Sequence, residues 1–222
     1  MRVFVGLIGV ATLCVSVSAQ NGKLTASEVN RITSEAYARL RAVSHHVSYS
    51  EEESSKVGNT ERGLTINEIT KKKADGSFHT IRHAIDGESK STTERIVIAG
   101  RRFIKSNEQP WAEEVGVVGG SGIGGPPGKI RAFSSMAKVD RDERINGTVA
   151  DKYQVSRHSV FERSDGKTDI SDSFSHYWID NSGRLLRTEI RRRTKTGSDW
   201  EEVHSIWDFR YDLDIKIEVP IK

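Results

Sequence analysis

The glycine-rich stretch at residues 115–128 holds the pattern nearest to a known chemical motif. Residues 120–125 match the GxGxxG spacing with which dinucleotide-binding folds hold a pyrophosphate. That chemistry needs a strand before the loop and a helix after it, whereas Pro126 and Pro127 interrupt the chain here. A P-loop fails as well, because Ile123 stands where its first glycine belongs. The stretch therefore predicts a flexible loop, which could act as a lid.

Seven histidines are the candidate metal ligands. His79 and His83 lie four residues apart, which in a strand separates them by about 13 Å. That is too far for two ligands of one ion. His45 and His46 point to opposite faces if they belong to one strand, and the others belong to different expected strands. We expect hydrogen-bonded histidines, with no metal site and no cofactor.

The sequence also lacks the usual signs of nucleophilic catalysis. No serine stands in a GxSxG motif, and the single cysteine lies near the N-terminus. The basic run at 191–195 is the strongest charge cluster. It indicates an edge strand protected by charge, with contact to anionic lipid headgroups as the alternative. We therefore expect a protein that is not an enzyme, and peripheral membrane contact stays a secondary hypothesis.

The first 19 residues are typical of a secretory signal peptide. Arg2 is followed by an apolar run at residues 3–17, and small residues precede a cleavage site after Ala19. The run is too short to span a bilayer, which takes about 18 or more apolar residues. Cys14 follows a leucine, where a lipidation signal requires a small residue. We expect a periplasmic or secreted protein that begins at Gln20 and is not lipidated.

The remaining residues 20–222 are expected to form a single domain. The chain has 34 basic and 31 acidic residues, so the loss of Arg2 leaves a net charge of +2. This balance argues against a nucleic-acid partner, since such proteins usually carry a larger basic excess. The only cysteine is lost with the signal, so stability must come from packing and hydrogen bonds.

One helix and then many strands are expected. Thr25 and Glu28 have the spacing of a capping box, which starts a helix that ends near Ala42. An apolar stripe on one side of this helix is formed by Val29, Ile32, Ala36 and Leu40. The period then changes to two, and turn signals recur at Asp75-Gly76, Asn146-Gly147, Asp165-Gly166, Asn181–Gly183 and Thr196-Gly197. Eight or more strands in a meandering antiparallel sheet are predicted.

Two further elements are expected. Residues 211–220 alternate strictly between apolar and polar, which predicts a closing strand. Ile130, Phe133, Met136 and Ala137 have a spacing that suits a short amphipathic helix after the glycine-rich loop. Such a helix could cover a cavity as a lid.

Several short stretches carry a family resemblance. They are Arg102–Lys105 with Gln109–Trp111, the turn and strand Asn146–Tyr153, the hairpin Tyr177–Arg187, and the end segment Tyr211–Pro220. With the order of elements, they resemble the LolA/LolB and LppX/LprG-like superfamily of bacterial exported lipid- and lipoprotein-binding proteins. The resemblance implies an α+β, mostly β fold, a strongly curved antiparallel sheet (an incomplete barrel) with helices over an apolar cavity. The long glycine-rich insertion and the charged strands depart from that pattern.

The same resemblance implies that acyl chains of a lipid or lipoprotein bind in the cavity. The expected wall and lid residues are Phe103, Ile104, Trp111, Ile130, Phe133, Met136 and Trp178. Phe133 and its neighbours could instead fill the core. A second hypothesis is therefore a non-enzymatic interaction or sensor module with a filled core and an envelope protein as its partner. A hydrolase has no residues in its favour.

Overall fold

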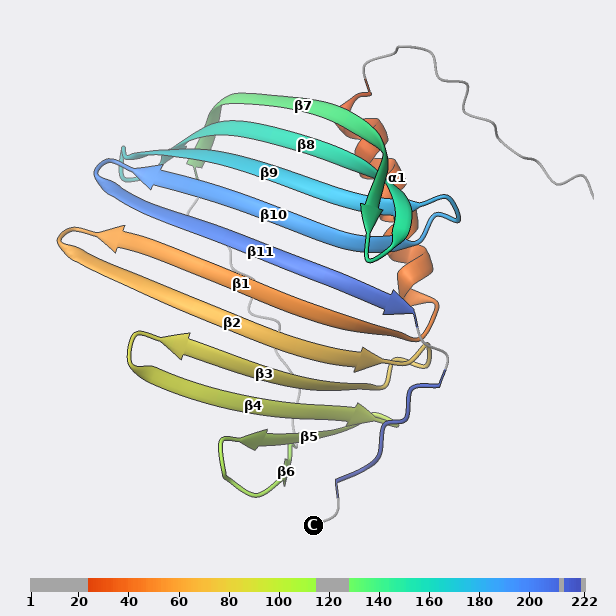
Figure 1. Ribbon diagram of the computed structural model, residues 1–222. Coiled ribbons are helices and arrows are strands. Elements are labelled where there is room, and N and C mark those ends of the chain that lie inside the picture. The colour runs from red at the N-terminus through yellow and green to blue at the C-terminus, as the bar shows by residue number, and fades with distance from the viewer. Residues whose placement is uncertain (1–23, 115–127, 212–213, 221–222) are drawn as a thin grey trace, which may run out of the picture.

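The computed structural model describes residues 24–114, 128–211 and 214–220, which form one helix and one sheet (Figure 1). The helix α1 spans Ala26–Arg41. The strands are β1 (His45–Val57), β2 (Thr60–Lys72), β3 (Phe78–Asp86), β4 (Ser89–Ile98), β5 (Arg101–Ser106), β6 (Ala112–Glu113), β7 (Gly128–Ile145), β8 (Thr148–Arg163), β9 (Thr168–Asp180), β10 (Leu185–Thr196) and β11 (Asp199–Tyr211). No helix in the described ranges is long and apolar enough to cross a bilayer.

The sheet consists of two meanders that meet at the first and last strands. Its order is β6-β5-β4-β3-β2-β1-β11-β10-β9-β8-β7, and neighbouring strands are antiparallel. The edges, β6 and β7, do not pair with each other, and the chain between Glu114 and Gly128 connects them. The expected mostly β fold with an open, curved sheet is confirmed.

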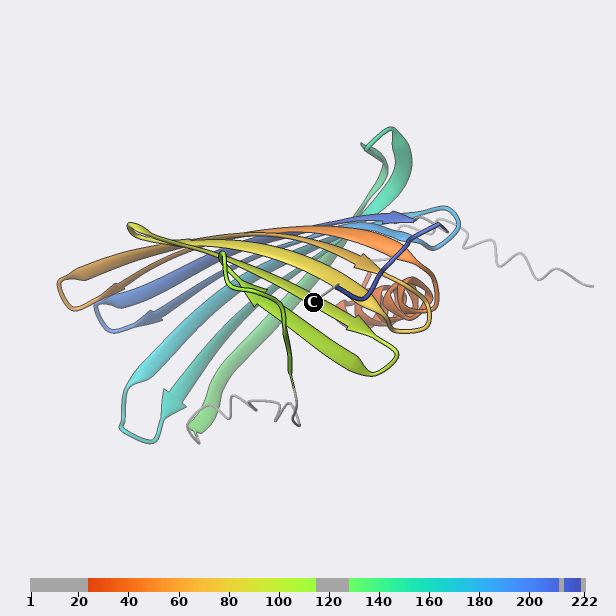
Figure 2. The same ribbon diagram turned by 90° about the horizontal axis from the view of Figure 1, so that it is seen from below.

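The sheet is curved, and α1 lies on its concave side. Figure 2 shows both ends of the sheet bending toward the side that holds the helix. Side chains alternate between the two faces along each strand. The cross-strand register therefore assigns each strand residue to the concave face, which α1 partly covers, or to the opposite, convex face.

The helix begins and packs as the sequence predicts. Thr25 Oγ1 accepts a hydrogen bond from the Glu28 amide at 3.2 Å, and the Glu28 carboxylate accepts one from the Thr25 amide at 2.7 Å. This capping box pairs two backbone donors at the start of the helix. On the apolar side, Ala36 and Leu40 are buried against Ile179, Leu185 and Phe209 of the sheet.

The β9–β10 turn also contacts the helix. Arg39 Nη1 donates to the Ser182 carbonyl at 3.1 Å, and Gly183 has a φ of +78°. A Cβ atom on Gly183 would lie 1.6 Å from Arg39 Nη1, so a glycine suits this close approach. The turn thus joins the C-terminal part of α1 to the sheet.

The predicted short helix at Ile130–Ala137 is wrong, because these residues belong to strand β7. A bulge between Ile130 and Ala132 shifts the register, so that Ile130 lies opposite Phe161 and Phe133 lies opposite Ser159. The register therefore assigns positions 130 and 133, which are three apart, to the same face of the strand. The bulge thus gives positions 130 and 133 the i, i+3 spacing of a helix, whereas Met136 falls on the opposite, convex face.

The predicted closing strand is also wrong over the residues that the structure describes. Residues 214–220 have no regular secondary structure, although Ile215 is buried. The preceding strand β11 already pairs with β1 and with β10, so no free edge lies beside it. The signal peptide at 1–19 and most of the glycine-rich loop lie outside the described residues.

Asp180 provides a pH test of the β9–β10 turn. Its carboxylate accepts hydrogen bonds from Ser182 and Arg184, including Ser182 Oγ at 2.7 Å and Arg184 Nε at 2.8 Å. Burial acts to raise the Asp180 pKa, but the hydrogen bonds from Ser182 and from the backbone and side chain of Arg184 outweigh burial and lower it. The carboxylate therefore stabilises the fold above the unfolded pKa of about 3.9, and this contribution is lost as the pH falls through the lower folded pKa.

We predict that Asp180→Asn lowers the free energy of unfolding at pH 7 by about 1–3 kcal/mol, because charged acceptors are lost from a buried site. Urea denaturation of both proteins between pH 2 and pH 7 measures the difference. The gap should narrow as the pH falls below about 4. Asp165→Asn, in the exposed β8–β9 turn, is the matched control and should change stability far less. A gap of equal size at pH 2.5 and pH 7 would contradict the assignment.

Candidate functional site

The concave face has a covered half and an open half. The helix α1 lies over strands β7–β11 (Figure 1), where it forms the main core with aromatic side chains of the sheet. Its members from the sheet include Tyr153, Tyr177, Trp207, Phe209 and Tyr211. The helix does not extend over β2–β5, as Figure 1 shows. The open half is therefore where a ligand has access to the concave face.

A groove of about 720 Å³ occupies this open half, and we call it the open groove. It is lined by Glu68, Thr70, Lys72, Phe78, Thr80, Arg82, Ala84, Ser91, Thr93, Arg95, Ile104 and Ser106. The strand register places all of these residues on the concave face. Its volume lies within the range of about 300–1,000 Å³ that is usual for small-molecule sites. The lining combines apolar, hydroxyl and cationic side chains.

Tyr49 lies between the covered half and the open groove. In the register it is opposite Trp207 on one side and Glu68 on the other, and its ring stacks on Trp207 at 4.9 Å between centroids. Its hydroxyl donates to Glu51, which also accepts a hydrogen bond from Ser205 at 2.9 Å. Burial, followed by the contact with Glu51, raises the Tyr49 pKa well above its usual value. Tyr49 is therefore a neutral donor at neutral pH.

The structure brings few of the predicted site residues together. Ile104 lines the open groove. Phe103, its neighbour in β5, points to the convex face, where it is 3% exposed and lies opposite the buried Ile96. Trp111 lies just before β6 and is half-buried. Adjacent residues of one strand cannot both face the groove, so Phe103 and Ile104 have different environments.

The predicted lid residues all lie on β7, at the far edge of the sheet from the groove. Phe133 is 61% exposed on the concave side, and Met136 is 73% exposed on the convex side. Ile130 is part of the same strand. Met136 contributes to a second hollow of about 890 Å³, near the start of α1 and strands β7–β9, which also includes Leu24, Val155 and Phe174.

Trp178 faces away from the open groove. It is 4% exposed on the convex side, where it packs with Ala150 and Leu186 below the tip of the β7–β8 hairpin. Its indole Nε1 donates to Glu143 at 2.7 Å, and Lys152 Nζ lies 5.2 Å from the ring centroid. These contacts bind the end of the β7–β8 hairpin to β9. Trp178 therefore has a structural role in this second, smaller core.

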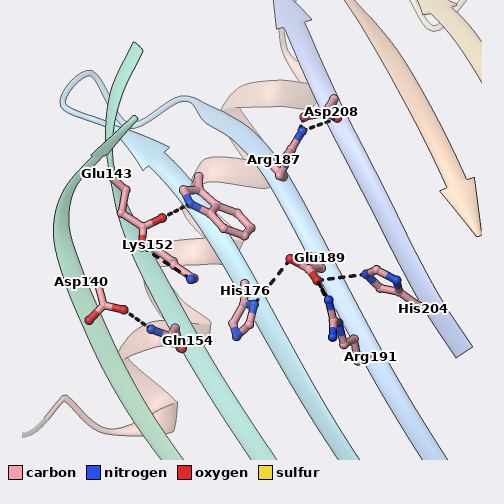
Figure 3. Close-up of polar contacts among 11 residues, drawn as sticks. Asp140, Glu143, Lys152, Gln154, His176, Arg187, Glu189, Arg191, His204 and Asp208 are labelled. Atoms are coloured by element: carbon pink, nitrogen blue, oxygen red, sulfur yellow. Dashed lines mark hydrogen bonds and ion pairs between the residues drawn. The ribbon is translucent and has the colours of Figure 1, made fainter. Parts of the chain in front are cut away.

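The convex face carries a polar network, which Figure 3 shows. Glu189 is its centre: it accepts hydrogen bonds from His204 at 2.9 Å and Arg191 at 3.0 Å, and His176 lies 3.7 Å away. Burial acts to raise the Glu189 pKa, but the hydrogen bonds from His204 and Arg191 outweigh it and the pKa is lowered. The His176 pKa is lowered by burial and by Lys152. The network joins β9, β10 and β11 across the convex face.

Other histidines on the convex face pair singly with neighbouring strands. His79 Nε2 lies 2.6 Å from Glu94, and His158 Nδ1 lies 2.7 Å from Asp172. His45 instead points to the concave side and bonds the Val43 carbonyl at 2.9 Å. Within residues 24–114, 128–211 and 214–220, no group of three or more His, Cys, Asp or Glu side chains is arranged to hold a metal ion.

Sequence reasoning missed Arg82 and Arg95, the two arginines of the open groove. The sequence contains one sign of their position. Phe78, Thr80, Arg82 and Ala84 are every second residue of β3, so their side chains share one face of the sheet. The Asp86-Gly87 dipeptide marks the β3–β4 turn and fixes the pairing of Arg82 with Thr93. The pattern thus places both arginines on the same face of the sheet, but it does not reveal that this face is the concave one.

Two solved structures are similar to this chain at a distant level. One is a DUF1329 family protein from Desulfovibrio piger, with a TM-score of 0.30 and 11% identity over 85% of this chain and 95% of that chain. The other, from Vibrio parahaemolyticus, is described as an outer membrane lipoprotein-sorting protein domain, with a TM-score of 0.30 and 10% identity over 84% and 93% of the two chains. No protein-family model and no curated protein matches the sequence. At these values the likeness does not identify a function.

The exposures of Phe133 and Trp178 lead to opposite predictions for stability. Phe133→Ala should lower the free energy of unfolding by less than about 1 kcal/mol, because an exposed ring leaves little cavity. Trp178→Ala should cost about 3–5 kcal/mol, because it empties a packed site. Chemical denaturation of the two variants and the wild type decides this. A larger loss for Phe133→Ala than for Trp178→Ala would contradict the placement of both residues.

Proposed function

We propose that this chain is an exported, non-enzymatic binding protein that holds the acyl chain of a lipid or lipoprotein in the open half of its concave face. The observation that carries this proposal is that α1 covers only part of a curved, unclosed sheet and leaves a groove of about 720 Å³ over β2–β5. A site that works by enclosing its ligand needs no nucleophile and no acid–base pair.

The lining of the open groove supports an amphiphilic ligand. Phe78, Ala84 and Ile104 provide half-buried apolar surface. Burial of an acyl chain contributes about 0.8 kcal/mol for each CH₂ group. Thr70 and Thr80 bond one another through their hydroxyl groups at 2.7 Å, so part of the polar lining is already paired and need not lose a water partner when an apolar chain approaches.

The export part of the proposal rests on the N-terminal residues. Arg2, the apolar run at 3–17 and the small residues before Gln20 have the order of a cleavable signal. The envelope is also where lipids and lipoproteins need a carrier through water. The two features of the proposal are therefore compatible with one another.

An interaction module is the second candidate, and one feature favours it. Strand β7 is an 18-residue edge strand, and residues 132–136 along it are exposed. An edge of this kind offers unpaired backbone groups to a strand of another protein. In that case the open groove would be a by-product of the curvature, and acyl ligands would not bind.

We predict that Ala84→Trp, which places a large ring in the open groove, weakens binding of a fluorescent monoacylglycerol by roughly tenfold or more, a loss of about 1.4 kcal/mol. Ile85→Trp is the matched control, because Ile85 is the next residue in β3 and is exposed on the convex face. Fluorescence titration measures the affinity, and thermal unfolding verifies the fold. Failure of the wild type to bind any acyl probe would overturn the carrier proposal and favour the interaction module.

We predict that the mature protein isolated from the envelope of an expressing bacterium begins at Gln20. Peptidase recognition of the small residues before this position is the physical basis. N-terminal sequencing or intact mass measures the result. A mass that retains residues 1–19, or an acylated Cys14, would contradict simple export.

A further inference from the structure

We infer that Arg82 and Arg95 form a binding site for a phosphoryl group inside the open groove, and that this site holds the headgroup of an anionic lipid. The inference rests on the proposed function, because it adds a headgroup site beside the apolar part of the same groove. It names the ligand class as a phosphate ester rather than a neutral acyl compound.

The strand register places the two arginines side by side on the concave face. Arg82 of β3 lies opposite Thr93 of β4, and Arg95 of β4 lies opposite Thr80 of β3. The arginines are therefore diagonal neighbours on adjacent strands, within reach of one another for side chains of this length. An anion between them can meet two guanidinium groups that approach from different strands.

Hydroxyl groups complete the donor set. Thr93 lies opposite Ser106 in the β4–β5 pair, and both line the open groove. Within the described part of the chain, neither side chain makes a hydrogen bond to another residue. Thr80 is bonded to Thr70, so it is less free to act. Thr93 is thus a hydroxyl donor beside Arg82, and Ser106, opposite Thr93 on the next strand, is a diagonal neighbour of Arg95.

The cations of the groove are not neutralised by the protein. Over the residues that the structure describes, the side chains of Lys72, Arg82 and Arg95 form no ion pair. The one carboxylate in the lining is Glu68, which lies opposite Arg82 and accepts a hydrogen bond from Thr70 at 3.1 Å. Three cations and one anion leave the open groove with an excess of two positive charges.

Arginine is the residue type suited to a phosphate ligand. Its planar guanidinium offers a fixed fork of donors that matches two phosphate oxygens. Phe78 and Ile104 line the same groove, so an acyl chain attached to the phosphate would have apolar surface nearby. Phosphate and acyl contacts within one groove favour a phospholipid over either part alone.

The test compares three probes by calorimetric titration: monomeric dihexanoyl phosphatidylglycerol, neutral dihexanoylglycerol, and inorganic phosphate. We expect the wild type to bind the phospholipid roughly tenfold or more tightly than the neutral glyceride. Arg82→Gln with Arg95→Gln should abolish this preference while the affinity for the glyceride stays. Arg82→Lys with Arg95→Lys should lose part of the preference for the phospholipid, because lysine keeps the positive charge but lacks the planar guanidinium that binds two phosphate oxygens.

The matched control is Arg193→Gln with Lys195→Gln, which removes the same charge from the convex face. This control variant should keep the full preference for the phospholipid over the glyceride. A loss as large as that of the Arg82 and Arg95 variant would contradict the proposed site and indicate a general effect of net charge. Equal binding of both lipids by the wild type would overturn the phosphoryl site and leave the acyl proposal standing. Binding of inorganic phosphate alone, lost in the Arg82 and Arg95 variant, would support the anion site and overturn the lipid as its source. Increasing salt should weaken phospholipid binding in the wild type but not glyceride binding.

Discussion

The pairing of β1 with β11 is the interaction on which the rest of the structure depends. These strands come from the two ends of the folded chain, and their register runs from His45 opposite Tyr211 to Lys56 opposite Trp200. Without this seam the molecule would be two separate meanders, β1–β6 and β7–β11. The Tyr49–Trp207 stack and the burial of Phe209 reinforce the seam from the concave side. Because the paired residues are more than 140 positions apart, closing this contact costs chain entropy, and such non-local pairing is typical of slow folding.

The seam also separates the apolar half of the concave face, under α1, from the polar half that holds the open groove. On the β11 side, α1 packs against aromatic side chains and forms the main core with them. This is the part of the sheet that the single helix stabilises. On the β1 side the concave residues are polar enough to face water without the helix, as Glu68, Thr70 and Arg82 show. One helix therefore covers the apolar half of the concave face, and strands β2–β5 stay uncovered. A more apolar lining would expose a large hydrophobic patch to water unless a second element covered it.

Local signals predicted the fold better than they predicted the site. The α1 capping box and the glycine turns depend on a few neighbouring residues, so the sequence is enough to find them. The lid helix was wrongly predicted because a bulge at Ile130–Ala132 gives positions 130 and 133 helical spacing, although Met136 falls on the other face. The closing strand was wrongly predicted because alternation gives no information about whether a neighbouring strand has a free edge. The candidate site depends on which face becomes concave, and this follows from long-range pairing and from the position of α1. Trp178 illustrates this limit of sequence-based prediction. A large apolar ring suits a cavity wall and a packed core equally well, and the structure places it in the smaller core.

The two faces of β3 and β4 differ in how their charged side chains are partnered, and this difference supports the proposed binding role. On the convex face His79 pairs with Glu94 across these strands, and elsewhere on that face Arg187 pairs with Asp208 at 2.7 Å. On the concave face of the same two strands, Arg82 lies opposite Thr93 and Arg95 lies opposite Thr80, with hydroxyl groups in place of carboxylates. Opposite charges in cross-strand pairs add to the stability of a sheet. On its β2 side Arg82 lies opposite an acid, Glu68, whose carboxylate accepts a hydrogen bond from Thr70, while Arg95 has no acid opposite it in either neighbouring strand. Within β3 and β4 these hydroxyl partners leave the guanidinium groups without an ion pair. Thr93, unlike Thr80, has a hydroxyl group that can donate to an incoming anion. The excess of positive charge in the open groove therefore supports the anion site inferred above.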